Sequence, residues 1–212
     1  MKIHRLAAFI ALTAACTTAA TQGASNESAA LGVLASDAGI HDKAMACDEL
    51  GRVGTAKAVP VLAKLLADEK LHDYARDGLE RIEDPAAGKA LLDALKTLKS
   101  GLRVGVIISL GDRGEASAVP ALAKIAKQNG KNKSAAGAAL SSLAQIATDE
   151  AGKAILAVLA EGDAEAKASA AHAALAAAQH MERDSRKEAA GRLRAAVAKA
   201  AVPAHIKKAA GK

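Results

Sequence analysis

Five leucines recur along this chain at nearly constant intervals, and this regularity constrains the fold more than any other feature. The intervals between them are 29, 31, 33 and 32 residues. The leucines are Leu50, Leu79, Leu110, Leu143 and Leu175. A period of this length is typical of stacked helical hairpins, each too small to bury its own apolar face. The sequence therefore predicts an all-α fold of about five such hairpins.

Small and apolar residues accompany these leucines at helical spacing. The positions four residues before them hold Ala46, Ala75, Val106, Ala139 and Ala171. The positions twelve residues after the first four hold Leu62, Leu91, Leu122 and Ile155. The first set shares a helix face with the leucines, and the second set belongs to a separate apolar stripe. Each repeat is therefore predicted to be a first helix and a second helix joined by a short link.

The links between the two helices of a pair contain helix breakers or capping residues. These are Gly54-Thr55, Asp84-Pro85, Gly114 and Thr148-Asp149. Asp84 before Pro85 suits an N-cap followed by a proline at the first helical position. Farther along, alanine dominates residues 164–180, which are predicted to be helical but weakly packed. Residues 185–188 read Ser-Arg-Lys-Glu, which matches a capping box at the start of another helix.

Two segments, residues 46–68 and 106–126, share a more specific pattern. Each has Leu-Gly toward the end of its first helix and Ala-Val-Pro-x-Leu at the start of its second. In this pattern the chain resembles the short HEAT-like repeats, about 30 residues long, of phycobilisome-lyase-type proteins. The resemblance covers about residues 40–180, although the second and fourth repeats lack Val-Pro and the fifth is distorted. It implies a right-handed α-solenoid whose second helices line the concave face.

The start of the chain has the features of a secretory signal peptide, which we assign to residues 1–24. Lys2 and Arg5 precede an apolar run over residues 6–15 that is too short to span a bilayer. Cleavage after Ala20 or Ala24 is the favoured interpretation. The segment 25–39 would then be an N-terminal tether or a short capping helix, and no transmembrane span is predicted.

A second interpretation of the leader uses Cys16. Residues 12–16 read Leu-Thr-Ala-Ala-Cys, which resembles a bacterial lipoprotein box except that Leu12 lies one position too early. In that case the leader would end before Cys16, which would become a lipidated N-terminus. We therefore expect an exported protein, periplasmic or secreted, that is anchored to a membrane only if Cys16 is lipidated.

Positive charge is concentrated at the end of the chain. The formal net charge is +6, and residues 183–212 contain nine Lys/Arg against two Asp/Glu. This segment is predicted to be a basic capping helix and tail that follows the repeats at 40–182. Binding of an envelope polymer or nucleic acid through the tail is an alternative function. Nucleic acid is not expected, because the tail has no aromatic residue for base stacking and the leader indicates export.

The sequence contains no recognisable catalytic or metal-binding constellation. None of the six histidines is followed by Glu, so the His-Glu pairs of HEAT-type deoxyhypusine hydroxylases are missing. After loss of the leader, Cys47 is the only cysteine, and we interpret it as a small, semi-buried filler. The chain is therefore predicted to be neither an enzyme nor cofactor-dependent. A lyase or enzyme-accessory role of the bilin-lyase type is the alternative, and it would require a reactive cysteine.

The best candidate site is a set of charged positions on the second helices. If positions 11, 12, 15 and 16 after each leucine face the core, then positions 10, 14 and 17 face outward. We predict that a protein partner binds there, on the concave face, and that the lysines form a positive ladder. The predicted site residues are Lys64, Lys89, Asp93, Lys96, Lys124, Lys127 and Lys153. The predicted function is an exported, non-catalytic scaffold for protein–protein interaction.

Overall fold

A computed structural model describes residues 22–98, 100–128 and 132–211. Every regular element in these ranges is a helix, so the predicted all-α class is confirmed. Cys16 and the predicted leader, apart from residues 22–24, lie outside the described residues. The chain divides into two compact units, Met1–Ala90 and Leu91–Lys212, which are described separately. The division falls within α5 (Pro85–Ala94) and within the range 40–182 that the sequence predicts as one repeat array.

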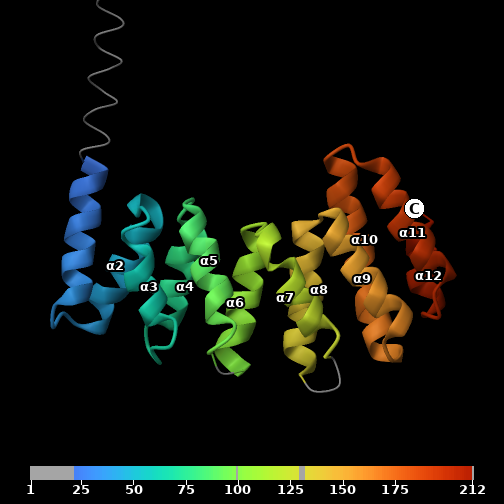
Figure 1. Ribbon diagram of the computed structural model, residues 1–212, viewed down its shortest axis with the longest axis horizontal. Coiled ribbons are helices and arrows are strands. Elements are labelled where there is room, and N and C mark those ends of the chain that lie inside the picture. Colours follow the sequence, from blue (N-terminus) through green and yellow to red (C-terminus); the bar gives the residue numbers. More distant parts are fainter. Residues whose placement is uncertain (1–21, 99, 129–131, 212) are drawn as a thin grey trace, which may run out of the picture. The chain divides into compact units, whose positions relative to one another are not determined.

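The first described element of the first unit is a helix over residues 22–35, and Figure 1 shows the labelled helices that follow it. These are α2 (Ile40–Val53), α3 (Val59–Leu65) and α4 (His72–Arg81). Helix α4 packs against both α2 and α3.

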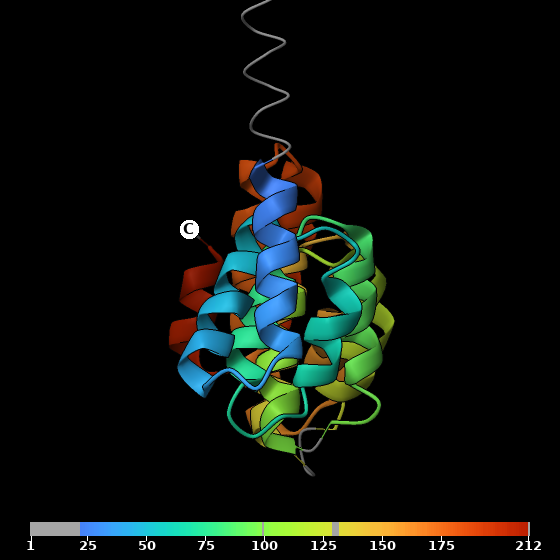
Figure 2. The ribbon, with the colours of Figure 1, turned by 90° about the vertical axis from the view of Figure 1, so that its left-hand side faces the viewer.

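The helix over residues 22–35 lies beside α2, as Figure 2 shows in blue. Its Glu27 is buried, and the carboxylate accepts hydrogen bonds from the backbone N and the Oγ1 of Thr55, at 2.6 and 2.8 Å. Asn26 donates a hydrogen bond to Glu49 on α2. These contacts attach the helix to α2 and to the link between α2 and α3. Its described residues, 22–35, extend across the boundary between the segments 1–24 and 25–39.

The second unit also consists of packed helices. It contains α6 (Ser100–Asp112), the short 3-10 helix η1 (Ala116–Ala118), α7 (Val119–Ala126), α8 (Lys133–Ile146), α9 (Asp149–Glu161), α10 (Ala164–Arg183), α11 (Lys187–Lys199) and α12 (Ala204–Ala210). The first helices α6, α8 and α10 pack in succession. The second helices α7, α9 and α11 likewise contact one another in succession. Helix α8 therefore lies between α6 and α10, and these neighbours help to bury an apolar face that it could not bury alone.

The periodic leucines and the second apolar stripe form the core, as predicted for the first four hairpins. Leu50, Leu79, Leu110 and Leu143 are 0% exposed. Leu62, Leu91, Leu122 and Ile155 are also 0% exposed. The fifth marker, Leu175, is only half-buried, and Ala171, Ala174 and Ala178 occupy the interior instead. In α10 the leucine of the sequence pattern is therefore not a core residue, and alanines fill the buried positions instead.

The prediction that residues 164–180 pack weakly is wrong. Helix α10 contacts α8, α9, α11 and α12, and its alanines are buried on more than one face. Alanine lacks the bulk that would keep neighbouring helices apart, so backbones can approach α10 from several sides. The small side chains of α10 thus accompany close packing, because a methyl group is enough to fill the narrow space between the helices.

The expected helix starts are met in one case and not in another. Asp84 accepts a hydrogen bond from the backbone N of Ala86 at 2.8 Å, and α5 begins at Pro85 as predicted. The capping box predicted at 185–188 is wrong, because α11 begins at Lys187 and Ser185 adopts a left-handed φ of 63°. The neighbouring Arg186 instead binds the carbonyl of Ala147 and the carboxylate of Asp149.

Candidate protein-binding surface

The predicted site residues lie on, or just after, the second helices. Lys64 is on α3, Lys89 and Asp93 are on α5, Lys124 is on α7 and Lys153 is on α9, while Lys96 and Lys127 directly follow α5 and α7. All six lysines are exposed, and Asp93 is half-buried. The exposure agrees with the assignment of positions 10, 14 and 17 to the outward side.

Helix α7 shows why these side chains face solvent. Leu122 and Ala126 are 0% exposed and lie one turn apart on the inward side. Lys124 lies halfway between them in sequence, about 200° around the helix from Leu122, so it must point away from the core. The same spacing separates the buried Ile155 from the exposed Lys153 on α9.

Two of the lysines are already paired with carboxylates. The Nζ of Lys96 lies 2.7 Å from Asp93 Oδ1, three residues earlier. The Nζ of Lys127 lies 3.5 Å from Glu161 Oε2, which joins the ends of α7 and α9. Asp93 thus acts within the set as a counter-charge. Such exposed pairs exchange readily with solvent and contribute little to stability.

Other lysines of the set present uncompensated charge. Lys64, Lys124 and Lys153 make no ion pair with any described residue. Because α7 packs against α9, Lys124 and Lys153 belong to neighbouring helices of the second unit. Lys64 lies in the first unit, so a continuous ladder along four hairpins stays a prediction.

Sequence reasoning missed a cavity beside Lys153. It has a volume of about 390 Å³ and lies among α9, α10 and α11. Its lining includes Gly152, Leu156, Met181, Arg192 and Leu193. Its residues come from three helices, so no single stretch of sequence reveals it. The one local signal is Gly152, nine residues after its leucine, where the first and third hairpins have Val59 and Val119; the second hairpin also has a glycine there, Gly88, so the signal is weak.

A second groove, of about 540 Å³, lies between α8 and α10 and contains both His172 and His180. The two imidazoles are eight residues apart on one helix, which places them about 12 Å apart along its axis. They therefore cannot share a metal ion. Among the described residues, no cluster of three or more His, Cys, Asp or Glu side chains is arranged to hold one.

Cys47 has the properties of a packed side chain. It is 0% exposed, and burial raises the pKa of its thiol from 9.0 to about 11. The thiolate is the nucleophilic form of cysteine, and the interior disfavours it. This environment argues against the chemistry that the lyase alternative would require of Cys47.

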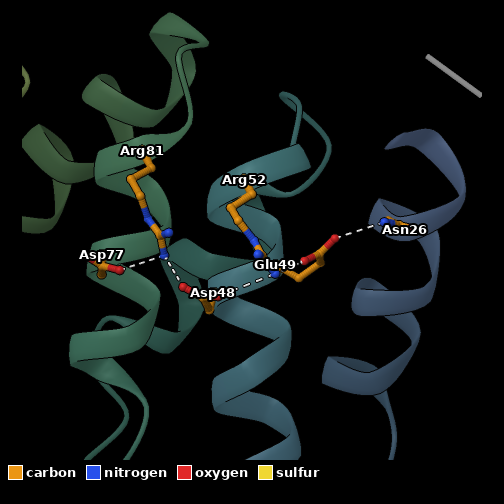
Figure 3. A network of polar contacts seen from close by, with 6 residues as sticks. All are labelled: Asn26, Asp48, Glu49, Arg52, Asp77 and Arg81. Carbon is orange, nitrogen blue, oxygen red and sulfur yellow. Dashed lines mark hydrogen bonds and ion pairs between the residues drawn. The ribbon is translucent and has the colours of Figure 1, made fainter. Parts of the chain in front are cut away.

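A polar network links the helices of the first unit, as Figure 3 shows. The guanidinium of Arg81 on α4 binds Asp77 at 2.8 Å and Asp48 on α2 at 2.6 Å. The hydrogen bond and charge of Arg81 lower the pKa of Asp48 below its ordinary 3.8. Arg52 joins Asp48 to Glu49 on α2. Each charged group of the network has a partner of opposite charge within it, and we assign the network a structural role in aligning α2 with α4.

None of the helices in the described ranges combines the length and the apolarity that a membrane crossing requires. Comparisons of the sequence with protein-family models and with curated proteins find no match.

Proposed function

We propose that this chain is an exported, non-catalytic scaffold of HEAT-like repeats, arranged as a right-handed solenoid, whose protein partner binds the outward side of the second helices. The observation that supports this most directly is the division of those helices into two sides. In four hairpins the positions twelve residues after the leucine are buried, while the lysines at positions 10, 14 and 17 are exposed. A surface that recurs at the repeat period suits an extended partner.

The charge of the surface defines the partner. Lys124 and Lys153 are exposed on adjacent helices, and no described carboxylate neutralises them. A partner with an extended acidic segment would contact several lysines at once. Each contact is weak and screened by salt, so the sum of several contacts would provide the affinity.

The experiment compares two triple variants with the wild type. In the first, Lys124, Lys127 and Lys153 are changed to Glu. In the control, Lys187, Lys199 and Lys207, which are exposed on α11 and α12, are changed to Glu. Both lose three positive charges and gain three negative ones. Affinity capture from cell envelopes should recover the partner with the wild type and the control but not with the first variant. Loss of capture in the control variant would instead favour binding through the basic C-terminal segment.

The proposed export has a separate test. Signal-peptide cleavage predicts a mature N-terminus at Thr21 or Ser25, and the lipoprotein alternative predicts a lipidated Cys16. N-terminal sequencing and mass spectrometry of the native protein distinguish these outcomes. An intact Met1 on a cytoplasmic protein would refute export.

A further inference from the structure

We propose that the cavity among α9, α10 and α11 is an anchor site that takes one bulky apolar side chain of the partner, with an adjacent carboxylate on its cationic rim. This inference rests on the proposed function, because Lys153 belongs to both surfaces. It adds the chemistry of the partner's central residue: an aliphatic side chain next to an acidic group.

The floor of the cavity is apolar and fixed. Met181 is 1% exposed and Leu193 is 3% exposed, so both side chains are held by the surrounding core. Leu156 is half-buried at the same site. The volume of about 390 Å³ exceeds what a single aliphatic side chain fills, which leaves room for the adjoining backbone. An aliphatic group entering the cavity would displace water chiefly from the half-buried Leu156, above the buried Met181 and Leu193.

Gly152 keeps this cavity open. A Cβ at this position would meet Met181 Cε and Leu193 Cδ2 at 3.5 Å, which is ordinary van der Waals contact. Packing therefore does not require glycine here, although glycine in a helix interior costs stability. At the equivalent position the first and third hairpins have the buried Val59 and Val119, whereas the second hairpin, like this one, has a glycine, Gly88. The missing side chain leaves unfilled space beside Met181 and Leu193.

The charges at the rim favour an anion. Lys153 makes no ion pair with any described residue, and Arg192 pairs only with Glu188, which is 91% exposed. The third charged residue of the lining, Asp149, is held by Arg186 and does not need the rim cations as partners. A carboxylate between Lys153 and Arg192 would therefore meet two available cations. Aliphatic binding at the floor and carboxylate binding at the rim together define the ligand class.

The test uses N-acetyl-leucine as the smallest probe of this class and the methionine methyl groups as reporters. In the full chain labelled with ¹³C at the methionine methyls, Met181 reports on the cavity. Met45, which is 54% exposed on α2 in the other unit, serves as an internal control. We expect a saturable shift of the Met181 methyl and none at Met45. N-acetyl-glycine, without the aliphatic group, and N-acetyl-leucinamide, without the carboxylate, should each bind at least about fivefold more weakly.

Three variants connect the shift to the cavity. Gly152→Val should abolish the Met181 response without lowering the melting temperature, and Gly152→Ala should weaken it while stabilising α9. Lys153→Glu should weaken binding of N-acetyl-leucine several-fold, whereas Lys207→Glu on α12 should not. The proposal is overturned if Met181 does not respond to N-acetyl-leucine, if the leucinamide binds equally well, if the response persists in folded Gly152→Val, or if it is undiminished in Gly152→Ala.

The outcome is separable from that of the proposed function. If the probe binds as described but charge reversal at Lys124, Lys127 and Lys153 leaves capture intact, the cavity and its ligand class stand, and the lysine surface fails as the binding site of the captured partner. If that triple variant no longer captures the partner while the Met181 methyl shows no shift with N-acetyl-leucine, the lysine surface is supported and the anchor site is wrong.

Discussion

Gly111, near the end of α6, lies at a close approach between two first helices. A Cβ there would come within 2.5 Å of Gln145 Oε1 and 2.7 Å of the Cα and Cβ of Ser142 on α8. The glutamine can move, but the backbone of α8 cannot do so without repacking. Absence of a side chain at this position is therefore a packing requirement.

Gly111→Ala is expected to lower the free energy of unfolding by about 1–3 kcal/mol, because the added methyl group forces α6 and α8 apart. Gly137→Ala on α8 is the matched control, since a Cβ there meets nothing within 4 Å. Helix propensity should make that variant more stable by up to about 1 kcal/mol. Urea unfolding followed by circular dichroism measures both changes. Equal effects of the two substitutions would contradict the close approach.

The Asp48–Arg81 pair predicts a pH dependence at the scale of single residues. Because the pKa of Asp48 is lower in the folded state, its stabilising contribution is present above the ordinary value of 3.8 and is lost as the pH falls through the lowered value. A carboxyl-carbon NMR titration should give a midpoint for Asp48 below 3.8, and Arg81→Gln should raise that midpoint. An unchanged midpoint in Arg81→Gln would show that the pair does not form in solution.

At the scale of elements, successive first helices meet in the same register in both units. Arg81, two residues after its leucine, packs over Gly51 on the preceding first helix. Gln145 occupies the same position after Leu143 and packs over Gly111. Each also binds an aspartate of that preceding helix, but Asp48 lies two residues before its leucine and Asp112 lies two residues after its own, so only the glycine contact is shared. This shared contact indicates that one hairpin geometry is used in each unit, which the sequence spacing alone only suggests.

Arg186 predicts how α11 is held to the preceding hairpin. Its Nη1 binds the carbonyl of Ala147 at 2.5 Å, and its Nη2 binds Asp149 at the start of α9. Arg186→Ala should remove both bonds, cost about 1–2 kcal/mol and speed amide exchange in α11. Arg192→Ala on the same helix, whose ion pair is more exposed, should leave exchange nearly unchanged. Equal protection of α11 in both variants would contradict this attachment.

The extent to which sequence predicts this molecule differs between its parts. Helices and their inward faces were predictable, because Leu50, Leu79, Leu110 and Leu143 recur at a fixed period and burial follows periodicity. The close packing of α10 could not be predicted from the sequence, because alanine favours a helix whether or not other helices surround it. The exposed lysines could be assigned to the outward side by spacing alone. The cavity at Gly152 could not be predicted from the sequence, since it depends on how three helices pack together.

At the scale of the whole molecule, the central structural question is whether the repeats unfold as one cooperative array. Leu79 is 0% exposed on α4 in the first unit. Leu79→Asp would bury an unpaired carboxylate at a cost of about 3–5 kcal/mol, against a total stability of about 5–15 kcal/mol. A continuous solenoid predicts loss of helix throughout the chain, as measured by circular dichroism. Persistence of the helical signal of the second unit, with its own melting transition, would show that the two units fold independently.

The proposed function requires that the outward lysines of α7 and α9 bind a protein partner. The most direct measurement is a calorimetric titration of the captured partner at low and physiological salt, with the wild type, the Lys124/Lys127/Lys153 triple Glu variant and the Lys187/Lys199/Lys207 triple Glu variant. The proposal predicts affinity that falls with salt for the wild type and the control. It predicts no measurable binding for the first triple variant, while single changes alter affinity less than about fivefold. Undiminished binding at low salt by the folded Lys124/Lys127/Lys153 variant would contradict it.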